Sequence, residues 1–310
     1  MKTKYINTFI LIISFFFLIE LLINKELIFN TISFSLNIWV NNLIPSLFPF
    51  FVISDILISY NLIYYIPKKI KLFISKLFNI SEQGVMIFLL SLISGFPSNA
   101  INTRKMYDLK LITEKEASHI LMFTHFSNPL FILGTVAIFF FNNPNLGVTL
   151  LLSHYISNII VGILFRKENV PSNNNLSKIN NNLIFGQIFT NAIKKAIDNL
   201  LLILGTLTCF LIISTIIVYN FSLDKYSSFI IQGILEITMG LKSLSLTNLN
   251  ELVKVIIASF FLAFGGLSVH MQVISQITKT SISYKPFFKG RIYQAIFASI
   301  VSFILYTLTT

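Results

Sequence analysis

Long apolar runs constrain this chain more than any other feature of its sequence. Five stretches reach or approach the ~20 apolar residues that cross the hydrocarbon core of a bilayer. They cover residues 6–23, 147–165, 200–219, 253–264 and 292–308. Of the 310 residues, 55% are hydrophobic and 11% are charged, whereas soluble domains carry roughly 25% charged residues. The surplus of apolar surface requires lipid, so the sequence predicts an all-α, polytopic membrane protein that has the lipid bilayer as a partner.

The distribution of charge and the lack of catalytic motifs exclude other classes of protein. The net charge is +11, but Lys and Arg stand in short connections between apolar runs and not on one folded face, so we expect no nucleic-acid partner. The only cysteine, Cys209, lies in an apolar run, which leaves no Cys-based metal site. No Walker loop, H-E-x-x-H or G-x-S-x-G pattern occurs in the sequence. We therefore expect neither an enzyme nor a bound metal or cofactor.

The first half contains segments that do not fit a simple membrane crossing. Residues 27–60 are too long for one span and contain Pro45 and Pro49, which remove backbone donors and bend helices, so they predict one bent, broken span. Residues 63–78 mix lysines with large apolar side chains, as an interfacial helix does. Residues 84–96 are too short to cross and end in the sequence Gly-Phe-Pro-Ser-Asn at 95–99, which indicates a re-entrant hairpin.

Helices in both halves are predicted to break inside the membrane. Thr113 and Glu116 form a capping-box pattern that opens a long helix, and a Ser-Asn-Pro sequence at 127–129 interrupts it. The second half repeats this plan with a long span, a short segment that ends near residues 238–240, a helix broken at the two glycines 265–266, and a last span. The repeat is one of architecture, because the two halves share no convincing residue-level identity.

Residues 166–182 are polar and rich in Asn, and they predict a cytoplasmic linker. This linker joins a first membrane half (1–165), which has an extra N-terminal helix, to a second half (183–310). When the first hairpin enters from the cytoplasm and the second from outside, all but four of the 23 Lys and Arg are cytoplasmic, in agreement with the positive-inside rule. The halves then form two inverted-topology repeats, the design of secondary transporters. The four external residues are Lys25, Lys225, Lys242 and Lys254.

Interrupted backbone at membrane depth is tolerated only where protein buries it or where it lines a water-filled cavity. We therefore expect the breaks to surround a cavity, the alternative being that each break is a packing kink. No Lys or Arg lies deep in the predicted spans, so an anion bound there would rely on helix N-termini and on polar side chains. The predicted substrate-binding residues are Ser98, Asn99, Ser127, Asn128, Glu236, Gly265, Gly266, Ser268, His270 and Gln272.

Two of these residues have more than one interpretation. Glu236 lies in an apolar stretch, where an unpaired charge costs ~3 kcal/mol on insertion scales. It either couples transport to a proton or cation or is hydrogen-bonded to the hairpin backbone, and the sequence leaves both open. His270 adjoins the second helix break and fits proton relay, substrate hydrogen bonding or a structural role. A cavity lined by Asn99, Asn128, Glu236 and Gln272 would favour transport over a structural role.

Five motifs, in this order, carry a resemblance to a known family. They are NLIPSLFPFFVIS at 42–54, SGFP at 94–97, SNPLFI at 127–132, LEIT at 235–238 and FGGLSVHMQ at 264–272. Together they resemble the sporulation integral membrane proteins of the YlbJ type, which contain a nucleoside-recognition (Gate) domain. The resemblance covers most of the chain.

The resemblance implies a membrane protein of endospore formers that is needed for late spore maturation. It implies a Gate domain similar to parts of concentrative nucleoside transporters, and movement of dipicolinic acid from the mother cell towards the forespore. The expected location is then the cell membrane, as a multi-pass protein of the mother-cell-derived outer forespore membrane. The leading hypothesis is a transporter or exporter of a small-molecule anion. A nucleoside carrier and a non-transporting scaffold of the spore envelope are the alternatives, and homo-oligomer formation is left open.

The basic residues around the linker predict which side of the membrane it occupies. Arg166, Lys167, Lys178, Lys194 and Lys195 cluster around it, so both of its ends are expected in the cytoplasm. A cysteine that replaces Asn174 should therefore not react with an impermeant thiol reagent applied to intact cells. Reaction from outside would reverse the predicted topology.

Overall fold

The computed structural model describes residues 2–166 and 184–309, and every element in those ranges is a helix. Six helices are long and apolar enough to cross a membrane, and a seventh crossing results if the pair Lys68–Phe78 and Glu82–Ser94, bent by 92°, counts as one span. The predicted all-α polytopic fold is confirmed. The predicted linker lies outside the described residues except for Arg166. The six helices are Tyr5–Ile23, Lys25–Ser59, Pro144–Leu164, Phe185–Asn220, Glu251–Ile277 and Tyr284–Thr309.

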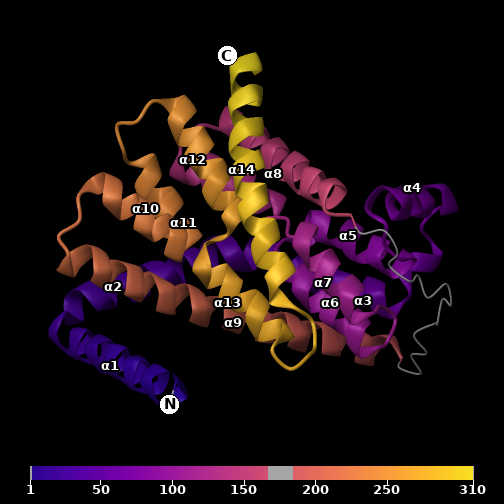
Figure 1. Ribbon diagram of the computed structural model, residues 1–310, viewed down its shortest axis with the longest axis horizontal. Helices are drawn as coiled ribbons and strands as arrows, with labels where there is room; N and C mark the ends of the chain where they lie inside the picture. Colours follow the sequence, from indigo (N-terminus) through magenta and orange to yellow (C-terminus); the bar gives the residue numbers. More distant parts are fainter. Residues whose placement is uncertain (1, 167–183, 310) are drawn as a thin grey trace.

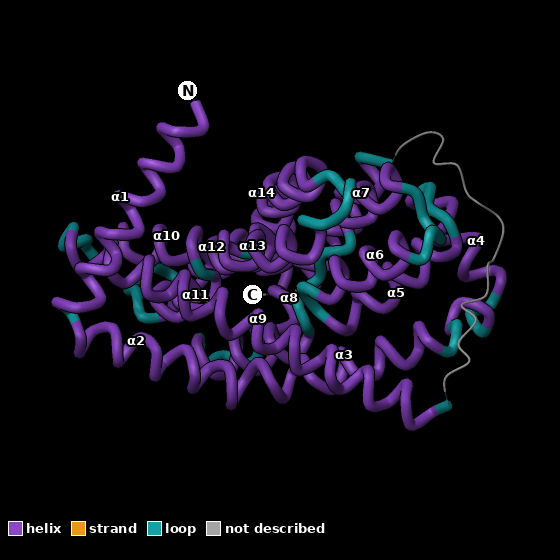
Figure 2. The backbone as a smooth tube through the Cα atoms, turned by 90° about the horizontal axis from the view of Figure 1, so that it is seen from below, coloured by secondary structure: helices purple, strands orange, loops and turns teal. Residues whose placement is uncertain are grey.

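The first helix, α1 (Lys2–Ile23), coincides with the predicted first span. It stands apart from the other helices in both views of the backbone (Figure 1, Figure 2). Its apolar segment Tyr5–Ile23 buries none of its residues against the rest of the protein. Lipid tails are as apolar as these side chains, so the bilayer can surround α1 without cost.

The prediction of a broken span between residues 27 and 60 is wrong. Helix α2 (Lys25–Ile38), the π-helical turn η1 (Trp39–Leu43) and α3 (Ile44–Ser59) follow one another without a gap and form a single helix of 35 residues. The wider π turn η1 directly before Pro45 accommodates its missing backbone donor, and Pro49 stands inside α3 without ending the helix. A helix of this length exceeds the ~30 Å hydrocarbon core, so it tilts or projects beyond the core.

The next three helices agree with the predicted interfacial helix and hairpin. A short 3₁₀ turn, η2 (Leu62–Tyr64), leads to α4 (Lys68–Phe78). One face of α4 is buried, while Phe73 on the other face is 66% exposed. Helices α5 (Glu82–Ser94) and α6 (Ser98–Asp108) then pack together as a helical hairpin at the predicted position.

The second interrupted helix of the first half also lies where the sequence predicts it. The side chain of Thr113 accepts a hydrogen bond from the backbone N–H of Glu116 and starts α7 (Glu114–Phe123). The Glu116 carboxylate does not complete the capping box, because it accepts from the backbone N–H of Ser81 at 2.7 Å. After a break the chain continues as the π-helical segment η3 (Phe131–Phe140) and then as α8 (Asn145–Leu164).

The second half follows the predicted order of a long helix, a hairpin, a broken helix and a last span. Helix α9 starts well before the predicted apolar run, and α14 starts well before its predicted position at residue 292. The cause is the same in both cases, since each helix extends beyond its apolar part through residues that include lysines. The elements are α9 (Phe185–Asn220), α10 (Lys225–Leu235), α11 (Ile237–Ser245), α12 (Glu251–Phe264), α13 (Gly266–Ile277) and α14 (Tyr284–Thr309).

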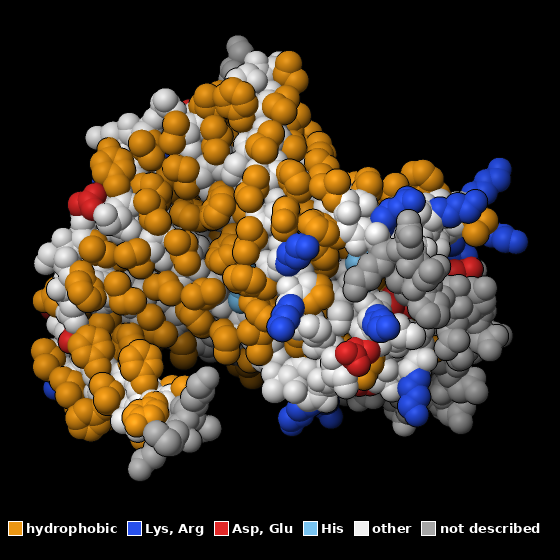
Figure 3. Space-filling model, viewed as in Figure 1, with side chains coloured by type: hydrophobic (Ala, Val, Ile, Leu, Met, Phe, Trp, Pro, Cys, Tyr) orange, Lys and Arg blue, Asp and Glu red, His pale blue; other side chains and the backbone are white. Residues whose placement is uncertain are grey.

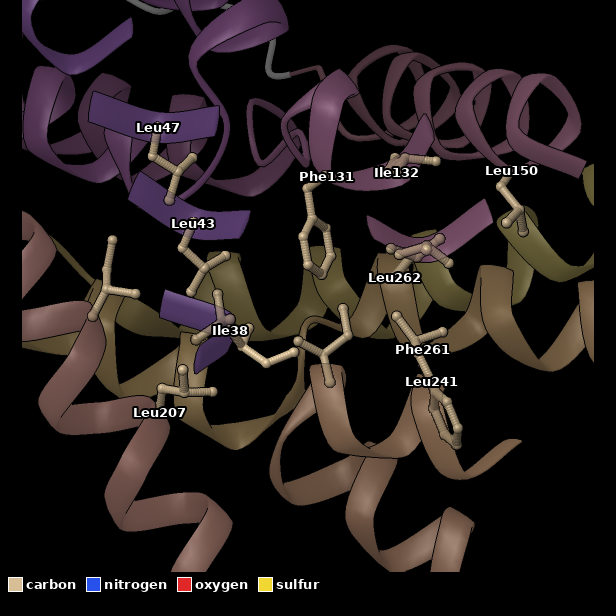
Figure 4. Close-up of a cluster of buried hydrophobic side chains, with 14 of the residues drawn as sticks. Ile38, Leu43, Leu47, Phe131, Ile132, Leu150, Leu207, Leu241, Phe261 and Leu262 are labelled. Atoms are coloured by element: carbon tan, nitrogen blue, oxygen red, sulfur yellow. The ribbon is translucent and has the colours of Figure 1, made fainter. Parts of the chain in front are cut away.

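Two sets of helix contacts join the halves. Helix α9 packs against α2 and α3, and α14 packs against α8 as well as α12. An apolar cluster in the interior contains Leu43, Leu47 and Phe131 from the first half with Leu207 and Leu241 from the second (Figure 4). The left and central parts of the face seen in Figure 3 are largely apolar, and most of the visible Lys and Arg side chains lie from its centre to its right edge. The inverted orientation of the halves stays a prediction.

Backbone contact between α10 and α11 depends on two glycines. The Cβ of an alanine at Gly240 would lie 2.1 Å from the Cα of Gly233, so Gly240→Ala should separate the hairpin helices and destabilise the protein by about 1–3 kcal/mol. We expect a lower melting temperature in detergent. Gly205→Ala is the matched control, because nothing lies within 4 Å of its new Cβ. Equal melting temperatures for the two variants would contradict the close packing.

Candidate functional site

Two helical hairpins turn at sharply bent tips, one in each half. Tip 1 comprises residues 95–97 between α5 and α6, where Gly95 has a φ of +74°, a region that favours glycine. Tip 2 is Glu236 between α10 and α11, which has extended backbone angles. Its carboxylate accepts a hydrogen bond from the backbone N–H of Met239 at 2.8 Å and thereby caps α11. Each tip therefore reverses the direction of the chain inside the protein, at a buried residue: Gly95 in tip 1 and Glu236 in tip 2.

Two helices are interrupted, again one in each half. Break 1 comprises residues 124–130 between α7 and η3. Break 2 is Gly265, which separates α12 from α13 with a φ of +88° and is followed by Gly266 with a φ of +67°. No side chain caps the N-terminus of α13, so its first backbone N–H groups have no partner within the helix.

Each tip touches the break of its own half. A Cβ added to Gly95 would lie 2.7 Å from the Cβ of Asn128 and 2.8 Å from its backbone nitrogen. A Cβ added to Gly266 would lie 3.0 Å from the backbone nitrogen of Ile237, next to Glu236. These distances leave no room for side chains, so tip and break are in backbone contact in both halves.

All four interruptions meet at one cavity of about 40 Å³, which we call the central cavity. Tip 1 contributes Phe96, break 1 contributes Ser127, tip 2 contributes Glu236 and the helix after break 2 contributes Ser268. The remaining wall comes from η1, α3, η3, α9, α11 and α13, and Figure 4 shows several of its apolar side chains. The cavity is lined by Leu43, Leu47, Phe96, Ser127, Asn128, Phe131, Ile203, Leu207, Glu236, Ile237, Thr238, Ser268, Val269 and Gln272.

Half of the ten predicted binding residues line this cavity, and the others lie around it. Gly265 and Gly266 form break 2 itself. Ser98 lines a smaller cavity, and Asn99 is 1% exposed on the same helix. His270 is held by Tyr284 Oη at 2.6 Å and by the carbonyl of Phe264 at 3.0 Å, which fits a structural role. The five lining residues are Ser127, Asn128, Glu236, Ser268 and Gln272.

Two hydroxyl groups in the central cavity have no hydrogen-bond partner. The side chains of Ser127 and Ser268 are 0% and 1% exposed, and neither Oγ atom makes a hydrogen bond within the described protein. One belongs to each half, at break 1 and in the first turn of α13. A buried polar group without a partner costs about 1–3 kcal/mol, so these two groups are free to bind a ligand or water.

Asn128 has a different role from the one predicted. Its Nδ2 donates to the carbonyls of Ser46 and Ile93 at 2.9 and 3.1 Å, and its Oδ1 accepts from the backbone N–H of Leu130 at 2.8 Å. No amide hydrogen is left to donate to a ligand. Asn128 instead fixes break 1 to α3 and to the end of α5.

A buried cation lies beside the cavity, contrary to the prediction that the spans contain none. Arg291 of α14 is 0% exposed. Its guanidinium donates to the carbonyls of Met122, His125 and Ala263 at 2.9, 3.3 and 3.4 Å. These carbonyls lie at the C-terminal ends of α7 and α12, where helices carry partial negative charge. No carboxylate pairs with Arg291 among the described residues.

Two polar side chains, those of Gln294 and His154, connect Arg291 to the central cavity. Asn158 accepts from the guanidinium at 3.1 Å, and Gln294 also accepts from it. Gln294 donates to the carbonyl of His154 at 3.1 Å, and the His154 Nε2 accepts from the backbone N–H of Ser127 at 2.9 Å. We call Arg291 and its acceptors the arginine cage. Arg291 directly precedes the predicted apolar run 292–308, and its spacing of three residues from Gln294, one turn of a helix, is the sequence signal that could have indicated a buried polar pair.

Removing the charge of Arg291 should destabilise the protein strongly. Arg291→Met leaves the carbonyls of Met122 and Ala263 without their donor, and each such group costs about 1–3 kcal/mol. We expect a loss of membrane abundance and a much lower melting temperature in detergent. Arg291→Lys should recover only part of the loss, since one ammonium group cannot reach acceptors on both helices. Lys285→Met, at an exposed position of the same helix, should have little effect.

Comparison with known proteins adds a relative. No protein-family model and no solved structure matches the chain, so the Gate-domain part of the resemblance stays a prediction. The chain is 28% identical to the sporulation integral membrane protein YlbJ of Bacillus subtilis over an alignment of 344 residues. That alignment covers 99% of this chain and 84% of the relative, from the first helix to the last. The chain is therefore similar along almost its whole length to a sporulation integral membrane protein of the YlbJ type.

Proposed function

We propose that this protein is a membrane transporter of a small anionic metabolite and that its cargo binds in the central cavity. One observation carries the proposal: four interruptions of the helices, two from each half, lie around a single cavity whose mainly apolar wall contains six polar side chains. Secondary transporters build their sites from discontinuous helices that meet between two repeats. The proposal assigns no catalytic reaction to the protein.

The polar groups of the cavity favour transport over a scaffold. A protein that only packs its helices together gains nothing from unpartnered hydroxyls at its centre, and each costs stability. Here Ser127 and Ser268 are unpartnered, and Glu236 and Gln272 line the same space. A ligand that accepts hydrogen bonds would satisfy both hydroxyls and the free N-terminal amides of α13.

The small size of the cavity indicates a closed state of such a transporter. About 40 Å³ is room for a few water molecules, since a cavity needs only ~10–15 Å³ of such space to hold one water. An aromatic or dicarboxylic cargo is larger and requires the halves to separate. Binding by separation of two halves is the behaviour of alternating access.

We propose that Glu236 couples the movement of the anionic cargo to the movement of a proton. Two unit charges 4 Å apart repel by about 4 kcal/mol at an effective dielectric constant near 20, and no Lys or Arg lines the cavity. A carboxylate cargo therefore needs a proton between itself and Glu236. We propose that Glu236 carries this proton while its other oxygen keeps its bond to Met239.

The family supplies the setting and a candidate cargo. The relative in Bacillus subtilis is described as a sporulation integral membrane protein, and we propose a role in spore formation for this chain as well. Dipicolinic acid, moved from the mother cell towards the forespore across the outer forespore membrane, is the candidate anion that the motif resemblance implies. A nucleoside is the second candidate, because Glu236 and Gln272 stand with Phe96 and Phe131 in the cavity wall and could bind an uncharged ring.

Uptake into liposomes tests the proposal and separates the two cargoes. Purified protein is reconstituted, and the entry of labelled dipicolinate and of labelled uridine is followed while pH and sodium gradients are varied separately. We expect protein-dependent movement of dipicolinate that responds to the pH gradient. Movement of uridine alone would support the nucleoside carrier, and movement of neither would support the scaffold.

Replacement of Glu236 by glutamine should abolish the response to pH. Glutamine keeps an oxygen that can accept from Met239, so α11 stays capped, but it cannot carry the coupling proton. We expect membrane abundance to hold while pH-driven dipicolinate uptake is lost. Glu251→Gln serves as the control, since Glu251 accepts from Asn143 and Tyr306 at the periphery. Normal pH-driven uptake by the Glu236 variant would leave this residue only its capping role.

A further inference from the structure

Two more cavities lie in line with the central cavity. One of about 480 Å³, which we call the vestibule, is lined mainly by polar and charged side chains. A smaller one of about 20 Å³, the inner cavity, shares four lining residues with the vestibule: Asp55, Ile101, Lys195 and Asn199. The two are therefore neighbours that the same side chains separate.

The faces of two long helices connect these cavities with the central one. Leu43 at the end of η1 and Leu47 of α3 line the central cavity, Phe51 and Ser54 of α3 line the inner cavity, and Ser59 of α3 lines the vestibule. The first four positions are three or four residues apart, so they share one face of the continuous helix.

The facing side of α9 has the same arrangement. Leu207 and Ile203 line the central cavity, Asn199 lines the inner cavity and the vestibule, and Asn191 and Ile188 line the vestibule alone. Because α3 and α9 pack against each other, the three cavities follow the seam between the two halves.

Helix α6 forms the third wall and leads to tip 1. Ser98, Ile101 and Asn102 line the inner cavity, and Lys105 lines the vestibule. Ser98 follows tip 1, whose Phe96 lines the central cavity. The inner cavity therefore lies between the vestibule and the site proposed for the cargo.

An ion-pair cluster closes this line between the vestibule and the inner cavity. The Asp55 carboxylate of α3 pairs with the Lys105 ammonium of α6 at 2.7 Å and with the Lys195 ammonium of α9 at 3.2 Å. Asp55 and Lys105 belong to the first half and Lys195 to the second. The cluster holds two cations and one anion, so its net charge is +1.

We infer that this cluster is both a docking site for a small carboxylate anion and the gate of the path along the seam. The inference rests on the proposed function for the class of cargo. A carboxylate that enters the vestibule binds Lys195 and takes it from Asp55, while Asp55 keeps Lys105. This exchange breaks the ion pair between Asp55 of α3 and Lys195 of α9, and the seam between the two helices can then open towards the inner cavity.

The two pairs of Asp55 differ in the way this exchange requires. The side chain of Lys195 is 54% exposed and its pair is the longer one, whereas those of Lys105 and Asp55 are 22% and 15% exposed. Exposed ion pairs contribute little stability, so Lys195 is the member that an incoming anion can reach and displace. Asp108 in the vestibule is paired with Arg104 at 3.3 Å.

Asp198 also lines the vestibule and is exposed. Its negative charge repels an incoming anion, so Asp198→Asn should strengthen the docking of the anion.

A buried reporter cysteine tests the gate independently of transport. Ser54 is 3% exposed and lines the inner cavity but not the vestibule. In a Cys209→Ser background, Ser54→Cys should react slowly with a water-soluble thiol reagent, and addition of dipicolinate should accelerate the reaction. Asp55→Asn, which removes both ion pairs of the cluster, should accelerate it without dipicolinate by about fivefold or more, a change that corresponds to about 1 kcal/mol in the opening equilibrium.

Two lysines on one helix provide the matched comparison. Lys195→Gln should raise the basal reaction rate at Ser54→Cys and remove the effect of dipicolinate. Lys194→Gln, with the same charge change at an exposed neighbour, should behave like the parent. Uridine should have no effect in any variant.

The outcomes separate the inference from the proposed function. Unchanged reaction rates in both Asp55→Asn and Lys195→Gln, in protein that elutes as the parent does from gel filtration, would overturn the gate even if liposomes take up dipicolinate. Accelerated reaction in those variants supports the gate even if no uptake is found. A dipicolinate effect that persists in Lys195→Gln would overturn the docking site.

Discussion

The arginine cage is the interaction on which the interrupted architecture depends. A helix that stops inside a membrane leaves its last carbonyls without donors, and lipid cannot satisfy them. Helices α7 and α12 both stop in the interior, and Arg291 donates to the C-terminal carbonyls of both. The partial negative charge of the two helix ends takes the place of a carboxylate around the buried guanidinium. One side chain of the last helix thus makes a break in each half tolerable.

The cage also determines the position of the candidate site. Through Gln294 and His154 it fixes the backbone N–H of Ser127, and Asn128 next to it is held by α3 and α5. The hydroxyl of Ser127 is left without a partner by this arrangement and faces the central cavity. At break 1, the backbone N–H of Ser127 and the side chain of Asn128 therefore hold the structure in place, while the hydroxyl of Ser127 is free to bind a ligand.

Sequence patterns predicted the interruptions well, because Gly, Pro and capping residues act locally. The tips at Gly95 and near Thr238 and the break at Gly265 follow from such signals. Long-range partners left no local signal: nothing in the sequence links Asn128 to Ser46, or Asp55 to Lys195. Arg291 was missed because an apolar run does not mark where a helix begins when that helix continues into polar residues. Pro45 led to a predicted break that the structure does not have, because the π turn before it accommodates the proline without interrupting the helix.

The backbone contact between each tip and its break has a mechanical consequence. Gly95 against Asn128 and Gly266 against Ile237 leave no layer of side chains that could slide, so each half carries its own tip and break as one stiff arm. The arms are fastened together at the arginine cage, which binds α7 and α8 of one to α12 and α14 of the other. Along the seam of α3 and α9, the ion pair between Asp55 and Lys195 joins them at the vestibule end. In the opening that we propose, the cage is the fixed point, so the arms separate most at the end farthest from it.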